Sequence, residues 1–593
     1  MRSMKTFSWM VAGAMFLSVA AVAANDHYAP VAGPLKTRWT AKVSPKNVWP
    51  EYPRPQMARQ EWLNLNGLWQ YALLPTNVPT PVSYDGKILV PFPIESALSG
   101  VMKRLDERSH LVYERKFHLP DTWTNQRVLL HFGAVDWVTT VFINGVELTT
   151  HIGGYDPFTY EITQALKPGQ PQEIIVDVYD PTEGGQPRGK QVRQPKGIWY
   201  TPTSGIWQTV WLEPVPEASI QELFITPDVD NKVLRLTVAV RGGTGDEMVD
   251  AIALDGHREV SHESGAAGSE LRLPMANPKL WSPDRPFLYN LKVILRSGDD
   301  RLDSVDSYFA MRKIALGKDG KGHTCPMLNG RPIFQIGTLD QGFWPDGIYT
   351  PPTDAAMRYD LEMTKKLGFN MVRKHVKVEP DRWYYDCDRL GLLVWQDMPS
   401  ADRGNVTEGQ QRWFEHELRR MIAAHYNHPC IVQWVLFNEG WGQFDTERLT
   451  ALIKELDPTR LVDDASGWTD KKVGDIIDMH KYPGPGAPQL EDYRAAVLGE
   501  FGGLGLAVDG HTWTKKTWGY QGMPDRKALT ARYVDLLDKV LELKRTKGLT
   551  AAVYTQITDV ETECNGLMTY DREVLKPDRS AVAAANRKLQ SEP

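Results

Sequence analysis

Two glutamates in this sequence each follow a short apolar segment, and their side chains could act as a pair. Glu439 comes shortly after residues 431–437, a largely apolar run that lies between a proline and a glycine. Such a run favours a buried strand of a parallel sheet over a helix. Glu500 follows a second apolar segment, residues 495–499, and precedes a glycine-rich turn. A carboxylate at the end of a buried strand can do acid–base or nucleophilic chemistry, and the alternative is that it caps the following loop.

Paired carboxyl groups suit the hydrolysis of a glycosidic bond, with one as proton donor and the other as nucleophile. In the retaining form of this reaction the two groups stand about 5–5.5 Å apart. The two glutamates need opposite protonation states, and a glutamate with the ordinary pKa of about 4.3 is ionised at neutral pH. We therefore expect partial burial and the charge of Glu500 to keep Glu439 protonated. This chemistry requires no metal and no organic cofactor.

Other kinds of catalytic site have little support in the sequence. No Gly-x-Ser-x-Gly elbow surrounds any serine, and neither a His-Glu-x-x-His spacing nor an EF-hand loop is present. We expect no essential metal and no cofactor. The four cysteines fit no zinc-binding spacing, so each is expected to be a small buried hydrophobic side chain, and the oxidation of any pair is left open. They are Cys325, Cys387, Cys430 and Cys564.

The size and charge of the chain limit the classes of protein to which it can belong. Its 593 residues exceed a single ordinary core, so two to four domains are expected. Hydrophobic residues at 42% and charged residues at 24% are typical of a globular protein. The formal net charge is -6, and no cluster of Lys and Arg alternates with aromatic residues. Nucleic acid is therefore not an expected partner.

The first residues have the layout of a secretory signal peptide. Arg2 and Lys5 precede an apolar stretch, residues 7–22, which ends in the small residues Ala21-Val-Ala-Ala24. We expect cleavage near Ala23 or Ala24 and export, to the periplasm if the cell envelope has one. A retained membrane anchor is the alternative, but the apolar stretch is short and no later segment is long and apolar enough to cross a bilayer.

Residues 25–214 are predicted to form a β-sandwich of the jelly-roll type. Residues 25–50 are polar and irregular, and we expect them to lie as a strap over this domain. Short β-rich runs then recur between turn signals, and residues 138–143 followed by Asn144-Gly145 predict a hairpin. We expect most of the tryptophans to lie in the core, because buried aromatic side chains dominate such cores. They are Trp62, Trp69, Trp199, Trp207 and Trp211.

Residues 215–312 are predicted to form a second, immunoglobulin-like sandwich. Residues 234–240 alternate between apolar and polar side chains, and residues 288–295 form another apolar-rich strand. About a hundred residues of this pattern is the usual size of such a domain. We expect it to act as a spacer.

From residue 313 to residue 593, short apolar strands alternate with amphipathic helices, which predicts a (β/α)₈ barrel in a multidomain protein of the β and α/β classes. Helices are expected at residues 354–367 and 413–425. Glu439 would follow the fourth strand and Glu500 the seventh, at the face where the active sites of such barrels lie. The eight strands are expected at residues 333–335, 369–372, 392–395, 431–437, 460–462, 476–479, 497–499 and 551–556.

The two glutamate motifs resemble those of a known family. Phe437-Asn-Glu-Gly-Trp441 and Leu498-Gly-Glu-Phe-Gly502 are similar to the acid/base and nucleophile motifs of glycoside hydrolase family 2, which includes β-galactosidases, β-glucuronidases and β-mannosidases. The resemblance extends from about Arg54 to the C-terminus. It implies an exo-acting, retaining β-glycosidase with a carbohydrate substrate, in which Glu439 is the acid/base and Glu500 the nucleophile, and the predicted signal peptide would export it.

The same resemblance implies further substrate-binding residues at the barrel mouth. Asn438 corresponds to the family's ligand of the sugar 2-hydroxyl. Two positions depart from the family pattern: His375 follows Arg373 by two positions where the family often has three, and Asp340 lies where many relatives carry an Arg- and His-containing loop. The other candidates are Trp441 as an apolar platform, His480 and Tyr482 at the end of the sixth strand, Gln556 and Asp559 at the end of the last, and Asp397 as an anchor behind the site.

The sequence leaves the sugar open. A β-galactosidase-like activity is the default expectation, and β-glucuronidase, β-galacturonidase, β-mannosidase and arabinosidase activities are alternatives. A uronide would need a cation to meet its carboxylate, for which Arg373, Lys374 and Lys481 are candidates. Competing hypotheses are an endo-acting glycosidase with the same barrel and a catalytically silent carbohydrate-binding protein, which would need neither glutamate. The oligomeric state is also left open.

Overall fold

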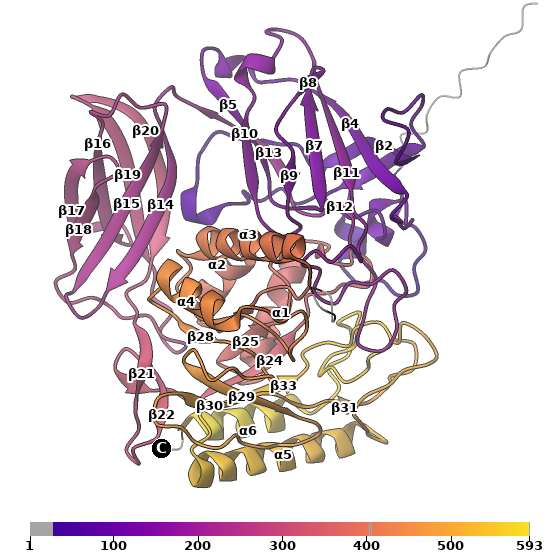
Figure 1. The fold of residues 1–593 in the computed structure, drawn as a ribbon, viewed down its shortest axis with the longest axis vertical. Coiled ribbons are helices and arrows are strands. Elements are labelled where there is room, and N and C mark those ends of the chain that lie inside the picture. Colours follow the sequence, from indigo (N-terminus) through magenta and orange to yellow (C-terminus); the bar gives the residue numbers. More distant parts are fainter. Residues whose placement is uncertain (1–27, 402–403, 405, 592–593) are drawn as a thin grey trace, which may run out of the picture.

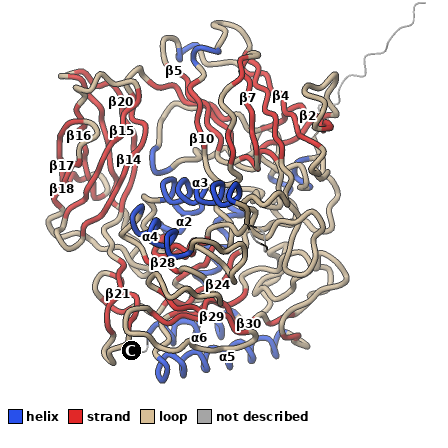
Figure 2. Tube along the Cα trace, viewed as in Figure 1, coloured by secondary structure: helices blue, strands red, loops and turns tan. Residues whose placement is uncertain are grey.

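The computed structural model describes residues 28–401, 404 and 406–591. The predicted signal peptide, residues 1–24, lies outside this part of the chain. Two β-sandwiches and a barrel are visible in Figure 1, with the first sandwich above the barrel and the second beside both. Figure 2 shows that the α-helices belong to the barrel, whereas the sandwiches consist of strands, loops and short 3₁₀ turns. This is the predicted combination of β and α/β domains.

The first sandwich packs two antiparallel sheets over an apolar core. In its strand β11 (Gln172–Tyr179) every second side chain is buried, as a strand with one face on a core requires. The predicted hairpin is present, with Asn144 and Gly145 in the left-handed conformation at φ 51° and 85°. One sheet has the order β1 (Leu63–Asn64), β13 (Val210–Val215), β5 (Arg127–Phe132) and β10 (Phe158–Glu161); the other has β3 (Gly86–Val90), β2 (Gly67–Pro75), β4 (Ser109–Phe117), β11, β7 (Val138–Ile143) and β8 (Val146–Glu147), with β9 (His151–Ile152) beside β7.

Three of the five tryptophans expected in this core, Trp69, Trp207 and Trp211, are buried. Trp62 and Trp199 are only half-buried. The domain also holds a small sheet of β6 (Val135–Asp136) and β12 (Gly205–Ile206), and the 3₁₀ turns Pro55–Met57, Ala97–Ser99, Asp121–Trp123 and Thr163–Ala165.

The second sandwich has the predicted immunoglobulin-like character, with seven strands in two sheets. One sheet has the order β14 (Ser219–Asp228), β15 (Val233–Arg241) and β18 (Glu270–Pro274); the other has β17 (Arg258–Ala266), β16 (Met248–Asp255), β19 (Tyr289–Ser297) and β20 (Asp300–Phe309). A small sheet of β21 (Ile314–Lys318), β22 (Thr324–Leu328) and β23 (Arg331–Pro332) leads into the barrel.

The barrel has the predicted eight strands, and every neighbouring pair in the ladder is parallel. The first strand lies at residues 335–340, whereas it was predicted at 333–335. The spatial order is β28-β27-β26-β25-β24-β33-β30-β29, and the two end strands also lie close together, so the barrel is nearly closed. The strands are β24 (Gln335–Asp340), β25 (Met371–Lys374), β26 (Leu393–Asp397), β27 (Ile431–Val435), β28 (Leu461–Asp463), β29 (Ile476–Lys481), β30 (Ala495–Gly502) and β33 (Ala551–Thr555).

Helices cover the barrel unevenly. No helix follows β28 or β29 in residues 464–475 and 482–494, all of which the structure describes. A long loop with β31 (Leu504–Gly505) and β32 (Gln521–Gly522) follows β30. The helices are α1 (Asp354–Lys366), α2 (Asp381–Leu390), α3 (Glu408–His425), α4 (Thr446–Leu456), α5 (Arg526–Lys547) and α6 (Arg579–Ser591).

Polar caps explain where two of these helices begin. The hydroxyl of Thr353 accepts a hydrogen bond from the Ala356 N–H, so α1 starts where it was predicted. The helix predicted to start at residue 413 begins at Glu408, because Thr407 and Gln410 form a reciprocal capping box.

Two general expectations can be compared with the described residues. None of the helices there is both long and apolar enough to cross a membrane. The four cysteines are buried and free, as expected for small hydrophobic side chains.

Candidate functional site

The candidate site lies at the carboxyl ends of the barrel strands. Glu439 follows β27, and Glu500 lies within β30, the seventh barrel strand along the chain. The backbone of Glu439 is left-handed at φ 54°, and its N–H donates to the carbonyl of Ser466 at 2.9 Å. One carboxylate oxygen from each glutamate and a ring nitrogen of His480 all lie within 4.8 Å of one another. The fold thus brings together two carboxyl groups that are 61 positions apart in sequence.

Glu500 is buried among donors and positive charges. The Tyr482 hydroxyl donates to Oε2 at 2.5 Å, and Arg373 Nη1 donates to Oε1 at 3.4 Å. Burial alone would raise the pKa of Glu500, but the positive charges of His480, Arg373 and Lys190 outweigh it and lower the pKa to about 2. The Glu500 carboxyl group is therefore ionised at neutral pH and available as a nucleophile.

Arg373 is completely buried and forms hydrogen bonds with several neighbouring side chains. Its guanidinium donates to Asp397 through Nε at 3.0 Å and Nη2 at 2.9 Å, and to Asn438 Oδ1 at 2.9 Å. His375 Nδ1 lies 2.9 Å from Asp397 Oδ2 and 3.9 Å from Glu500 Oε1. Burial lowers the pKa of His375 well below its usual value, so it is neutral at neutral pH. Arg373, not His375, therefore supplies positive charge here, and Asp397 anchors both side chains.

His480 lies between the two glutamates. Its Nδ1 is 3.0 Å from Glu439 Oε1 and 3.6 Å from Glu500 Oε2, and its Nε2 is 2.8 Å from Ser466 Oγ. Burial opposes the charged imidazolium, but the negative charges of Glu500 and Asp478 and the hydrogen bond with Glu439 outweigh this effect and raise the pKa of His480. His480 therefore attracts the ionised Glu500 electrostatically and contacts Glu439 through a hydrogen bond.

Other predicted ligands lie in hydrogen-bond networks away from the two glutamates. Asp340 accepts from Lys374 Nζ at 2.6 Å and from the Gly342 N–H at 2.8 Å. Gln556 accepts from Gln341 at 2.9 Å and donates to Asn565 at 2.8 Å. These contacts satisfy both side chains within the protein, and a direct substrate contact by either one stays a prediction.

The other cations and acids proposed from the sequence are also engaged elsewhere or exposed. Lys374 pairs with Asp340 and Glu379 and lies over the ring of Trp383 on α2, outside the strands. Lys481 is an exposed side chain on β29. Asp559 accepts from Lys576 at 2.6 Å.

The first sandwich contributes residues that the sequence did not reveal. Lys190 lies 4.4 Å from the ring centroid of Trp441, and Trp199 lies 5.1 Å from the same ring. The Tyr200 hydroxyl donates to Glu563, a buried acid after β33 whose pKa burial raises to about 7. Trp199 was expected in the sandwich core; instead it packs on the barrel, because the loop that carries it extends from the sandwich onto the barrel mouth. The length of that irregular segment, residues 180–204, was the available signal.

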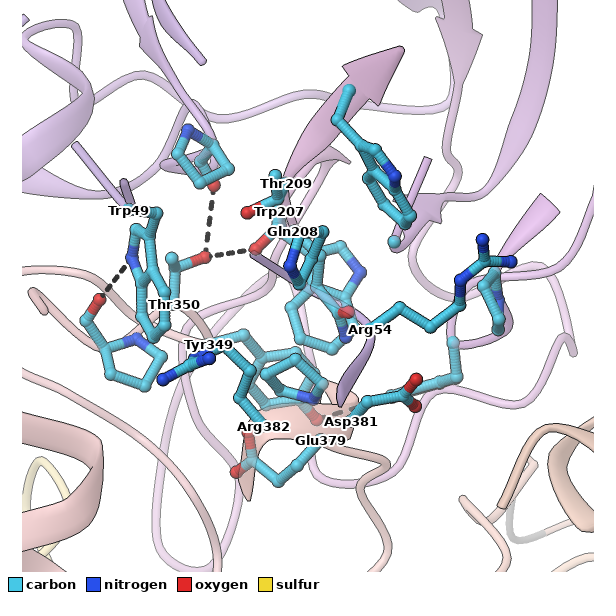
Figure 3. A pocket seen from close by; sticks show the side chains of 18 of the residues that line it. Trp49, Arg54, Trp207, Gln208, Thr209, Tyr349, Thr350, Glu379, Asp381 and Arg382 are labelled. Carbon is cyan, nitrogen blue, oxygen red and sulfur yellow. Dashed lines mark hydrogen bonds between the residues drawn. The ribbon is translucent and has the colours of Figure 1, made fainter. Parts of the chain in front are cut away.

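A hollow of about 70 Å³ lies where the first sandwich meets the barrel. Figure 3 shows the side chains that line it. The Trp49 ring N–H donates to the Pro351 carbonyl at 3.0 Å, and the Thr350 hydroxyl donates to the carbonyls of Trp207 and Pro91 at 2.6 and 3.1 Å. The lining is mainly apolar and includes neither Glu439 nor Glu500. This hollow belongs to the contact between domains, so the barrel mouth remains the candidate site.

Comparison with known proteins identifies related sequences along most of the chain. Residues 57–207 match the glycosyl hydrolase 2 galactose-binding domain-like family, residues 218–312 match glycosyl hydrolases family 2, and residues 352–498 match the TIM barrel domain of that family. The third match ends just before Glu500.

Two curated relatives have different names. A putative beta-glucuronidase of Formosa agariphila is 29% identical over 66% of this chain and 48% of its own length. A beta-galactosidase of Thermoanaerobacter pseudethanolicus is 26% identical over 74% of this chain and 61% of its own length. The chain thus matches only about half to three fifths of these relatives.

Solved structures share the fold. The beta-glucuronidase of Ruminococcus gnavus matches with a TM-score of 0.72 and 19% identity over 92% of this chain and 99% of that one. A putative beta-galactosidase from Bacteroides fragilis matches with a TM-score of 0.70 and 22% identity over 90% of this chain and 86% of that one.

Proposed function

This chain belongs to glycoside hydrolase family 2, and from that membership we propose that it is an exported, exo-acting, retaining β-glycosidase. The observation that carries the proposal is the short separation of the two carboxyl groups, since oxygens of Glu439 and Glu500 lie within 4.8 Å. A retaining enzyme needs about 5–5.5 Å between the groups, and an inverting enzyme about 6.5–9.5 Å to admit water. The observed separation favours direct attack by a carboxylate.

The geometry supports separate roles for the two glutamates. Glu500, ionised and held by Tyr482 and Arg373, attacks the anomeric carbon and forms a glycosyl ester while the bond to the departing oxygen breaks. Glu439 gives its proton to that oxygen. In the second step Glu439, now ionised, takes a proton from water as the water displaces Glu500. His480 contacts both carboxyl groups and keeps them oriented.

We propose a terminal β-galactoside as the first substrate to test. Relatives named beta-galactosidase and beta-glucuronidase both support a β-linked hexose or hexuronide. For a uronide, the cation that could meet the carboxylate is Lys190 of the first sandwich, whose charge already acts on Glu500. A panel of chromogenic β-galactoside, β-glucuronide, β-galacturonide, β-mannoside and α-arabinoside distinguishes these alternatives. Residues 1–24 carry the export proposal, which N-terminal sequencing of the exported protein tests.

Azide rescue tests the catalytic roles. In Glu439→Ala the nucleophile is kept, so an activated aryl glycoside should form the ester with Glu500, which then accumulates because no base activates water. Azide needs no base and should speed this variant and give the β-glycosyl azide. In Glu500→Ala azide can attack from the opposite face and should give the α-azide. Loss of proton donation should cost about 10²–10⁴-fold on substrates with poor leaving groups.

The matched control is Glu455→Ala, which removes an exposed glutamate from α4 and should keep the parent activity. Azide products of the same configuration from both variants would show that the roles are wrongly assigned. Release of the inverted sugar by the parent, observed by proton NMR before mutarotation, would contradict the retaining mechanism.

A further inference from the structure

Trp468 is a large apolar side chain that lies half in solvent at the barrel mouth. It is 51% exposed and stands on the loop after β28. Its ring centroid is 5.6 Å from that of His480, with the two rings at 67°. His480 in turn lies 3.0 Å from Glu439 Oε1. The exposed indole is therefore one side chain away from the proposed proton donor.

The loop that carries Trp468 is fixed to the catalytic loop. The Glu439 N–H donates to the Ser466 carbonyl at 2.9 Å, and the Ser466 N–H donates to the Phe437 carbonyl at 2.9 Å. Gly467, at φ 99°, passes so close to His480 that a Cβ there would lie 2.8 Å from Nδ1. These contacts hold the backbone beside the indole in one position.

A single exposed apolar side chain is ordinary on a protein surface, so exposure alone does not mark a site. Trp468 differs in its place relative to the reacting groups. A second exposed aromatic, Tyr520 at 41%, stacks on Tyr482 at 3.7 Å between centroids, and Tyr482 bonds Glu500. One exposed ring therefore stands on the Glu439 side of the pair and another on the Glu500 side.

We propose that Trp468 is the platform of the leaving-group subsite, where its indole binds the apolar face of the sugar or aryl ring that departs. The inference rests on the proposed function, because the leaving group lies on the side of the residue that protonates it. An indole has a large, rigid apolar face, and pockets for small molecules are commonly lined by such aromatic side chains. The ligand class is a glycoside whose leaving group contains a ring.

Three substrates with the same glycone and different leaving groups test this role in the full chain. A disaccharide and a p-nitrophenyl glycoside carry a ring beyond the bond that is cleaved, whereas a glycosyl fluoride has no group to place on Trp468. For Trp468→Ala we expect kcat/KM for the disaccharide to fall by about 30-fold, as for removal of a central binding residue. The value for the p-nitrophenyl glycoside should also fall, because its ring would lie on the same indole, whereas the value for the fluoride should stay unchanged. Trp468→Phe should retain part of the disaccharide activity.

The matched control is Tyr493→Ala, which removes an aromatic side chain that is 58% exposed and lies just before β30, at the opposite end of that strand from Glu500. It should leave all three substrates unaffected. A loss on the disaccharide with none on the p-nitrophenyl glycoside would overturn the inference, because Trp468 would then act through His480 on proton donation by Glu439, which only the poor leaving group needs. An equal loss on all three substrates would overturn it too, because the fluoride has no ring to place on Trp468. No loss on either substrate would also overturn it. A parent protein inactive on every glycoside, the fluoride included, would instead overturn the proposed function itself.

Discussion

Tyr482 is the closest hydrogen-bond donor to Glu500 in the described site, and its hydroxyl also lies 2.7 Å from Thr555 Oγ1. Removing the hydroxyl takes away a donor that favours the ionised form of Glu500. We therefore expect Tyr482→Phe to lower kcat by about 10²–10³-fold, the usual cost of losing one preorganised donor.

The same variant should change the pH dependence. The pKa of Glu500 is lowered to about 2, so the nucleophile is ionised at all but strongly acidic pH, and the acidic limb of the activity profile lies near that value. Without the Tyr482 hydroxyl the pKa rises, so the acidic limb of the kcat/KM profile should move to higher pH. Tyr533→Phe is the control, because its hydroxyl bonds Asn586 on α6. An unmoved acidic limb in Tyr482→Phe would contradict this account.

The meeting of Glu439 and Glu500 at one end of the barrel could be predicted from the sequence, because each glutamate comes shortly after the start of a buried apolar run. Lys190, Trp199 and Glu563 could not, since they meet only when a loop of the first sandwich packs on the barrel. For Asp340, the sequence predicted the position of the residue but not the contact that its side chain makes. Its position at the end of β24 was predicted, but the direction of its side chain toward Lys374 depends on tertiary packing.

The barrel strands were predictable because parallel strands buried on both faces are almost continuously apolar. The start of α3 was placed too late, since its first turn is polar and carries no apolar periodicity. The strand at residues 431–437 was predicted two residues too long, because Leu436 and Phe437 are buried but have left the ladder of β27. Burial and strand pairing are separate properties, and apolar composition reports only the first.

The loop between β28 and β29 positions His480 through close backbone approach. A Cβ at Gly467 would lie 2.8 Å from His480 Nδ1 in a backbone conformation, φ 99°, that favours glycine. Gly467→Ala should displace His480 from Glu439 and lower kcat/KM by about 100-fold, which a misplacement near 1 Å can cause. Unlike the change at Trp468, this loss should extend to the fluoride, because His480 also lies 3.6 Å from Glu500, which attacks either substrate.

Gly510→Ala is the control that separates the displacement of His480 from the effect of backbone strain alone. Gly510 also has positive φ, at 81°, but a Cβ there meets no atom within 4 Å among the described residues. Both variants should lose similar stability, measured as the midpoint of thermal unfolding, whereas only Gly467→Ala should lose activity. Equal activities of the two variants would contradict a positioning role for this loop.

The segment before the first sandwich joins that domain to the barrel. It was expected to lie as a strap over the sandwich, and Tyr28 does donate to the Leu98 carbonyl there. It also contacts the barrel, where Asp346, in the loop after β24, accepts hydrogen bonds from the Thr37 N–H, the Thr37 hydroxyl and the Thr40 hydroxyl at 2.9, 2.7 and 2.6 Å. Sequence patterns could not reveal this role, because the segment is irregular and its partners lie about 300 positions away.

Asp346→Ala tests whether this attachment stabilises the assembled molecule. The change removes three hydrogen bonds to one buried carboxyl group and leaves their donors without that partner. We expect the free energy of unfolding to fall by about 3 kcal/mol, since hydrogen bonds to charged groups contribute about 1.5–3 kcal/mol each and such losses are not additive. Thermal unfolding should show a lower midpoint, and limited proteolysis should show earlier cleavage before residue 50.

The kcat of the folded Asp346→Ala variant should be unchanged, because Asp346 forms no hydrogen bond with Glu439, Glu500 or His480 in the described chain. Asp509→Ala, at an exposed aspartate, provides the control, and an equal midpoint for the two variants would mean that the segment contributes nothing to holding sandwich and barrel together.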